Sequence, residues 1–156
     1  MPAGFFSEGC VVAVRAGGAE YERVWVCEHV EFAEAYMSRA LELLGKGNPY
    51  DAAEKLWASV RRVTLALTEL ALGRVAPERG ETWRAFIARA LRVAGLESGR
   101  AEELALVFVE VRDRLHGAVF YGAVYEEQEH KPVFEKGFEY VRVVAGLVSR
   151  LAGATT

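Results

Sequence analysis

The chain of 156 residues is long enough for one domain with its own hydrophobic core and too short for two. Apolar residues make up 52% of the chain and charged residues 26%, which excludes an intrinsically disordered protein. No apolar stretch approaches the ~18 residues of a membrane-spanning helix, and Met1 to Glu8 lack the basic leader of a secretory signal. We therefore expect a globular, cytoplasmic protein that has no contact with a membrane.

The net charge of −3 gives no general attraction to nucleic acid, but the charge is distributed unevenly. Residues 61 to 92 carry seven Arg against three Glu, a net charge of +4, whereas residues 93 to 130 carry three Arg against eight acidic residues, a net charge of −5. The two segments form a phosphate-binding patch beside an acidic one, complementary surfaces of two identical chains, or ordinary solvated helix faces. The candidate contacts to a nucleotide or nucleic acid are Arg61, Arg62, Arg84, Arg89 and Arg92.

The N-terminal segment has the pattern of a β-hairpin. Residues 9–15 and 21–27 alternate in polarity on either side of two glycines, which predicts two short paired strands. In this hairpin Cys10 lies opposite Cys27, and the two could form a disulfide, although reduced thiols are the rule in a mesophilic cytoplasm. A zinc site with His29 lacks the fourth ligand that a structural zinc needs, so we expect no metal there. Arg supplies 15 of the 19 basic residues, and amides are few, features typical of a thermophilic source or a GC-rich genome.

From about residue 28 the apolar residues recur with the 3.6-residue period of an α-helix. Asn48-Pro49 and Thr82 are helix starts, because their side chains can cap free backbone amides. The pattern predicts a mainly α protein, an antiparallel up-and-down bundle of about five helices over 28–152, with a hairpin appendage at 1–27 and a frayed tail at 153–156. The five helices are expected at about 28–44, 49–72, 82–94, 104–119 (with a continuation toward 125) and 132–151.

Residues 47–57 read GNPYDAAEKLW, and further along the chain Leu115-His116 is followed by Phe120-Tyr121. These two segments resemble the archaeal PaREP family. The resemblance covers roughly residues 29 to 151. PaREP proteins are similar to HEPN domains, small helical bundles that commonly pair through their helices. The resemblance implies a homodimer, and it implies as further partners RNA or a nucleotide and, in toxin–antitoxin pairs, a nucleotidyltransferase.

Some HEPN domains are metal-independent ribonucleases that carry an Arg and, after four to six intervening residues, a His. Here Arg112 and His116 are the matching pair, with three residues between them. A helix places both on one face, where the imidazole could transfer a proton and the guanidinium could stabilise a pentavalent phosphate. The alternative interpretation is a surface cluster of charged and polar side chains without catalytic function.

Other candidate sites are less specific. Glu126, Glu127, Glu129 and His130 could bind a metal but are typical of a solvated connector. Four aromatic residues either line a nucleotide pocket or belong to the core: Trp57, Trp83, Tyr121 and Tyr125. Signatures of phosphate loops, zinc proteases and dinucleotide-binding folds are absent, so no cofactor and no metal is expected. The leading hypothesis is a non-enzymatic module that binds a nucleotide or nucleic acid; the alternatives are an endoribonuclease using Arg112 and His116 and a purely structural assembly protein.

Overall fold

The helix Pro49–Leu72 lies at the centre of the molecule and packs against other helices on both sides. The computed structural model describes residues 20–154 of the chain. Its elements in chain order are α1 (Glu20–Gly45), α2 (Pro49–Leu72), α3 (Trp83–Val93), α4 (Ser98–Glu110), the π-helix η1 (Val111–Tyr121) and α5 (Glu127–Ala154).

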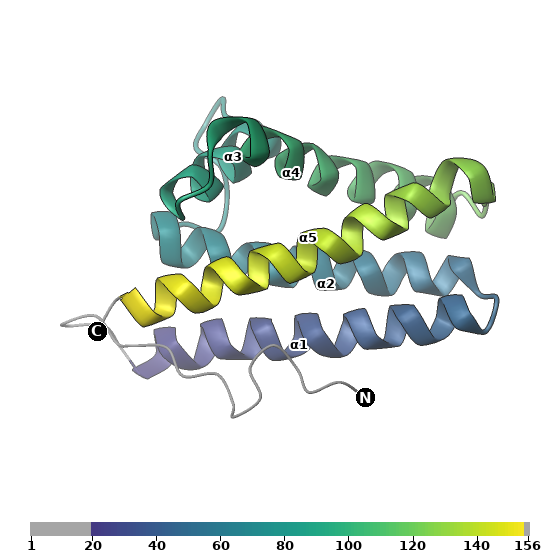
Figure 1. Cartoon of the computed structure of the whole chain (residues 1–156), viewed down its shortest axis with the longest axis horizontal. Coiled ribbons are helices and arrows are strands. Elements are labelled where there is room, and N and C mark those ends of the chain that lie inside the picture. Colours follow the sequence, from purple (N-terminus) through teal and green to yellow (C-terminus); the bar gives the residue numbers. More distant parts are fainter. Residues whose placement is uncertain (1–19, 155–156) are drawn as a thin grey trace.

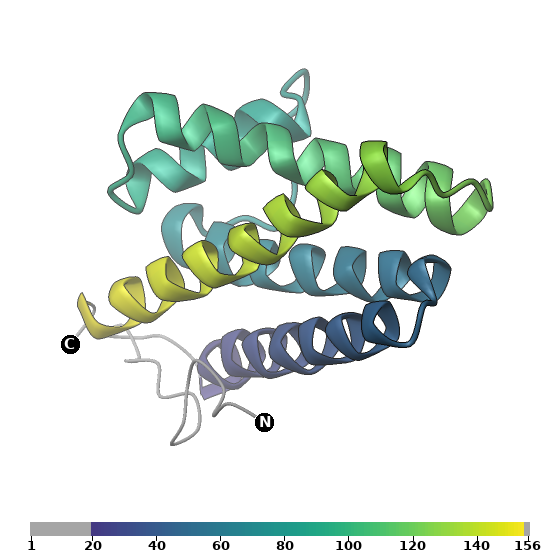
Figure 2. The ribbon, with the colours of Figure 1, turned by 45° about the vertical axis from the view of Figure 1, so that its right-hand side comes forward.

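The elements form two layers joined by the last helix. α1 and α2 run antiparallel along one side of the molecule, and α3 lies with α4 and η1 on the opposite side of α2 (Figure 1). α5 crosses α2 obliquely and also packs on α4 and η1 (Figure 2). The predicted helical bundle is therefore confirmed for the described part of the chain, in which no strand occurs.

The predicted caps form as expected. The side chain of Asn48 accepts a hydrogen bond from the Asp51 amide at 3.1 Å, and Gly73 ends α2 in the left-handed conformation at φ 67°. The side chain of Thr82 accepts a hydrogen bond from the Ala85 amide at 3.1 Å and starts α3. These local hydrogen bonds fix where the central helices begin.

The prediction of a second hairpin strand at residues 21–27 is wrong. Residues 21–27 belong to α1, and Val26 is fully buried on the same helical stripe as Val30 and Ala33. A short run rich in apolar residues cannot be assigned to a strand or a helix from its pattern alone, and here the longer helical stripe decides the conformation. Consequently the boundary expected between an appendage at 1–27 and a bundle at 28–152 falls inside a helix; the first strand, at 9–15, lies outside the described residues.

The last helix starts earlier than the position of Pro132 predicts. α5 begins at Glu127, and the backbone amide of Glu126 donates a hydrogen bond to Nδ1 of the buried His130 at 2.9 Å. The His130 ring also stacks on Tyr125, with centroids 5.8 Å apart. These contacts stabilise the part of α5 that precedes Pro132, although Pro132 cannot donate a hydrogen bond within the helix. At the other end α5 extends to Ala154, beyond the predicted start of the frayed tail.

Among the helices of residues 20–154, none has both the length and the apolar composition needed to span a membrane.

Candidate functional site

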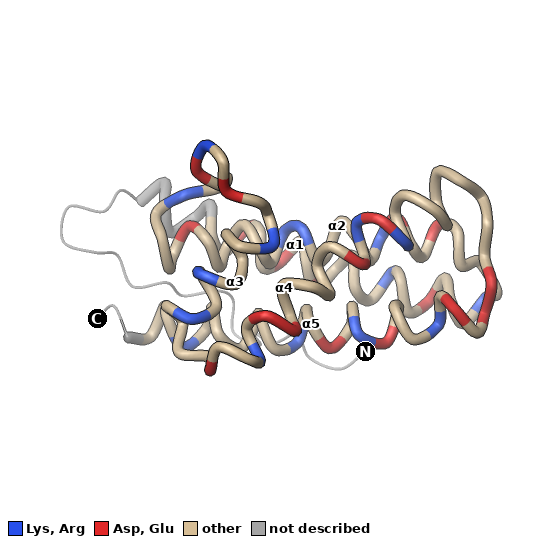
Figure 3. The backbone as a smooth tube through the Cα atoms, turned by 90° about the horizontal axis from the view of Figure 1, so that it is seen from above, with Lys and Arg blue, Asp and Glu red and all other residues tan. Residues whose placement is uncertain are grey.

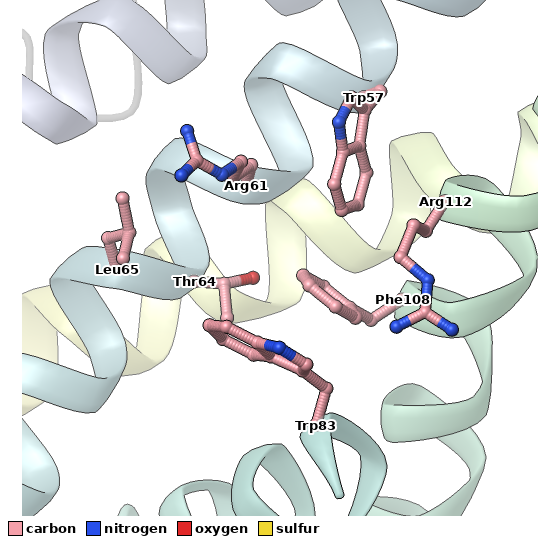
Figure 4. Close-up of a pocket in the computed structure, with 7 residues that line it drawn as sticks. All are labelled: Trp57, Arg61, Thr64, Leu65, Trp83, Phe108 and Arg112. Atoms are coloured by element: carbon pink, nitrogen blue, oxygen red, sulfur yellow. The ribbon is translucent and has the colours of Figure 1, made fainter. Parts of the chain in front are cut away.

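A pocket opens between the two layers, at the centre of the molecule. Its cavity volume is about 180 Å³. α2, α3, α4 and the first turn of η1 each contribute to its walls (Figure 4). The lining residues are Trp57, Arg61, Thr64, Leu65, Trp83, Phe108 and Arg112.

Aromatic rings form most of the wall. The ring of Phe108 lies between two tryptophans, with its centroid 5.2 Å from Trp57 and 5.9 Å from Trp83. Trp83 is the first residue of α3, directly after the Thr82 cap, and its ring packs edge-on against the buried Phe86. Packing against neighbouring rings therefore holds these side chains in place along the wall of the cavity.

A buried hydrogen-bonded pair lies behind the rings. The hydroxyl of Thr64 donates to the Val60 carbonyl at 2.6 Å, so the Tyr140 hydroxyl donates to Thr64 Oγ1 at 2.6 Å. Burial raises the pKa of Tyr140, which is fully enclosed and contacts Phe108. The phenol therefore remains neutral and acts as a fixed support for the pocket floor.

Two guanidinium groups lie at the edge of the pocket, on opposite sides of the ring cluster (Figure 4). Arg61 is exposed, and among the described residues no carboxylate pairs with it. Arg112 donates to Asp113 from Nε at 2.8 Å and from Nη2 at 3.3 Å. These hydrogen bonds raise the pKa of Arg112 and fix its orientation, and they leave three of its five N–H groups for a ligand.

His116 continues the row of rings outward from Trp57. The two ring centroids are 5.7 Å apart, and His116 also contacts Phe120 at 5.7 Å and Tyr121 at 4.9 Å. Burial lowers the pKa of His116, and the nearby carboxylate of Glu54 opposes this shift without cancelling it. The imidazole therefore stays neutral to a lower pH than a free histidine side chain.

Both residues of the candidate catalytic pair lie on η1, next to the pocket. Arg112 lines the cavity together with Trp57, and the His116 ring stacks on Trp57. The sequence predicted that Arg112 and His116 share one face of an α-helix. The segment is instead a π-helix, in which hydrogen bonds join residues five apart. For example, the Gly122 amide donates to the Gly117 carbonyl at 3.0 Å.

The five candidate basic contacts do not form one patch. Only Arg61 reaches the pocket. Arg62 faces α1, where it donates to His29 Nδ1 at 3.1 Å and lies over the Phe32 ring.

The remaining three basic candidates form ion pairs within the chain. Arg89 makes a bidentate pair with Glu81 at 3.0 Å. Arg84 and Arg92 face Glu102 at 3.9 and 3.5 Å. Basic and acidic residues are interspersed along the helices (Figure 3). These pairs offset part of the charge asymmetry of the sequence.

The aromatic candidates separate into three environments. Trp57 and Trp83 line the pocket. Tyr121 is 73% exposed at the outer end of the ring row, and Tyr125 stacks on His130. Sequence reasoning missed Phe108, which it assigned to a helix stripe; its position one turn before Arg112 was the signal that could have placed it at the site.

The other predicted sites add little to this region. Cys27 is half-buried on α1, and because Cys10 lies outside the described residues, their disulfide remains a prediction. Among residues 20–154, no three side chains of metal-binding type gather.

Comparison with known proteins identifies the family. A model of the archaeal PaREP1/PaREP8 family matches residues 28–133, more than half of the chain, and this range contains every residue of the pocket and the ring row. No curated protein and no solved structure matches the chain. The resemblance noted in the sequence is thus confirmed, and the chain belongs to the archaeal PaREP1/PaREP8 family.

Proposed function

We propose that this protein is a non-enzymatic module that binds a nucleotide unit, with the base against the aromatic wall formed by Trp57, Phe108 and Trp83 and the phosphate at Arg61 or Arg112. The observation that carries the proposal is the pocket itself, in which three aromatic walls and two guanidinium groups meet. Bases stack on aromatic rings whatever their identity, and guanidinium groups bind phosphate oxygens in pairs.

The size of the cavity limits what part of a ligand enters it. Pockets for drug-sized ligands enclose about 300–1,000 Å³, and this one encloses about 180 Å³. One flat ring therefore fits inside, while the sugar and phosphate stay outside, near the exposed edge where the arginines lie. This division of a ligand into a flat apolar part and an anionic part is the chemistry of a nucleotide.

The two arginines provide the test of the proposal. Arg61→Ala and Arg112→Ala test the two positions: the variant that lacks the phosphate contact should bind adenosine 5′-monophosphate about tenfold more weakly, because one charge-assisted contact is worth about 1.5 kcal/mol or more. Binding can be followed by tryptophan fluorescence, since two of the three tryptophans line the pocket. Isothermal titration calorimetry gives an independent affinity.

Arg114→Ala is the matched control, because Arg114 is an exposed residue of η1 that does not line the pocket. It removes the same charge and should leave the affinity within about twofold. Equal losses in all three variants would show that only net charge matters and would contradict the proposed site. Absence of binding to the wild-type protein would contradict the proposed function.

A metal-independent endoribonuclease is the second candidate function. The observation that favours it is the imidazole of His116, whose lowered pKa favours the neutral form that can accept a proton, on the same helix as the charged Arg112. Incubation of the pure protein with single-stranded RNA in the presence of a chelator tests this activity. Cleavage that is lost in His116→Ala would replace the non-enzymatic proposal, whereas binding without cleavage supports it.

A further inference from the structure

The pocket is one end of a longer row of aromatic rings. From Trp57 the row continues to His116, whose ring plane is inclined by 30° to that of Trp57. His116 is stacked on Phe120 with an interplanar angle of 11°, and Tyr121 meets both rings edge-on. The row thus reaches from a partly enclosed cavity to the protein surface.

Tyr121 has the properties of a stacking platform. Its side chain is 73% exposed, the largest exposed fraction among the large hydrophobic residues of the described chain. Contacts with Phe120 at 5.0 Å and with His116 at 4.9 Å nevertheless fix the ring. An exposed aromatic ring that is already held in one orientation loses little conformational entropy when a flat ligand stacks on it.

The charges around the row permit an anionic ligand. Among the described residues, the charge that shifts the His116 pKa is that of Glu54, and Lys55 pairs with Glu54 at 3.3 Å. Arg112 lines the same pocket as Trp57, on which His116 stacks, and three of its five N–H groups have no acceptor among the described residues. A phosphate that links two bases can therefore lie beside Arg112 without facing an unpaired carboxylate.

We propose that Tyr121 is a second base-stacking platform and that the ligand is a single-stranded oligonucleotide of at least two nucleotides. One base occupies the pocket at Trp57, and its neighbour stacks on Tyr121, with His116 and Phe120 behind it. This inference rests on the proposed function, because it requires the first base to occupy the pocket.

The test compares adenosine 5′-monophosphate with the dinucleotide pApA and the single-stranded hexanucleotide of adenosine. Wild-type protein should bind pApA about tenfold more tightly than the monophosphate, since a second stacked base contributes that order of affinity. Tyr121→Ala should remove this gain and leave the affinity for the monophosphate unchanged. Tyr121→Trp should retain the gain, because the indole offers an equal or larger face.

The control is Tyr50→Ala, which removes another exposed tyrosine, located in the first turn of α2 and outside the ring row. It should leave both affinities unchanged. Equal affinity of the wild-type protein for pApA and the monophosphate would overturn the second platform while leaving the pocket intact. An equal loss for both ligands in Tyr121→Ala would also overturn it, and a wild-type protein that binds neither ligand would contradict the proposed function as well.

Discussion

Gly137 shows how the absence of one side chain determines the packing of a helix. A Cβ atom at this position would lie 2.7 Å from Cδ2 of Leu56 on α2 and 3.2 Å from Cγ2 of Val111 on η1. Leu56 and Val111 are fully buried, so neither can move into solvent. Glycine therefore lets α5 approach α2 and η1 closely behind the pocket.

We expect Gly137→Ala to lower the free energy of unfolding by about 1–3 kcal/mol, because a methyl group has to be inserted into a packed core. The measurement is urea denaturation followed by circular dichroism. Gly146→Ala is the control on the same helix, where an added Cβ meets no atom within 4 Å. There alanine should raise stability by about 0.5–1 kcal/mol through its better helix propensity, and a loss at Gly146 similar to that at Gly137 would contradict the packing argument.

Single residues could be predicted from sequence where the determining contact is local. The caps at Asn48 and Thr82 were predictable, because each side chain bonds to an amide three residues later. The different directions in which Arg61 and Arg62 point could not be predicted from the sequence. These neighbours face the pocket and α1 respectively, and which one faces which side depends on how α2 is rotated in the bundle.

At the scale of elements, the N-terminus of α3 connects stability to the site. Thr82→Ala should lower the free energy of unfolding by about 1 kcal/mol, since the Ala85 amide loses its acceptor. It should also weaken nucleotide binding slightly, because Trp83 directly follows the cap. Thr82→Ser retains a hydroxyl and should behave like the wild-type protein in thermal denaturation; a Ser variant as unstable as the Ala variant would show that the methyl group, rather than the cap, is responsible.

Long-range packing explains the elements that the sequence pattern predicted incorrectly. Residues 21–27 alternate like a strand, but Val26 joins the buried stripe of α1. The expected fourth helix is divided into α4 and η1. A π-helix and an α-helix place apolar side chains at similar spacings over one or two turns, and two glycines near the end of the segment favour neither strongly.

For the whole molecule, mild acid should reduce stability through two histidines. Burial lowers the pKa of His29, assisted by Arg62 and Arg61 and opposed by Glu28, and burial also lowers that of His116. Both histidines bind protons more readily in the unfolded chain, near the reference pKa of 6.5. The free energy of unfolding should therefore fall as the pH decreases from 7.5 to 5.

Urea denaturation at several pH values measures this slope, and His116→Gln should make it shallower. The lowered pKa values of Glu42 and Glu81 begin to affect stability only as the pH approaches their reference value of 4.5, at the acidic end of this range. A stability that does not change between pH 7.5 and 5 would contradict the prediction. The homodimer and the nucleotidyltransferase partner concern contacts between chains and remain predictions.

Because the walls of the pocket come from both layers, an occupant would join α3 and α4 to α2. Any compound that binds only the folded chain must then raise its melting temperature, and at a hundredfold excess over the dissociation constant the gain is about 2.7 kcal/mol. The melting temperature of the protein can thus be used to detect ligand binding. A thermal-shift screen of metabolite and oligonucleotide libraries would identify the natural occupant directly, as the compound that raises the melting temperature most.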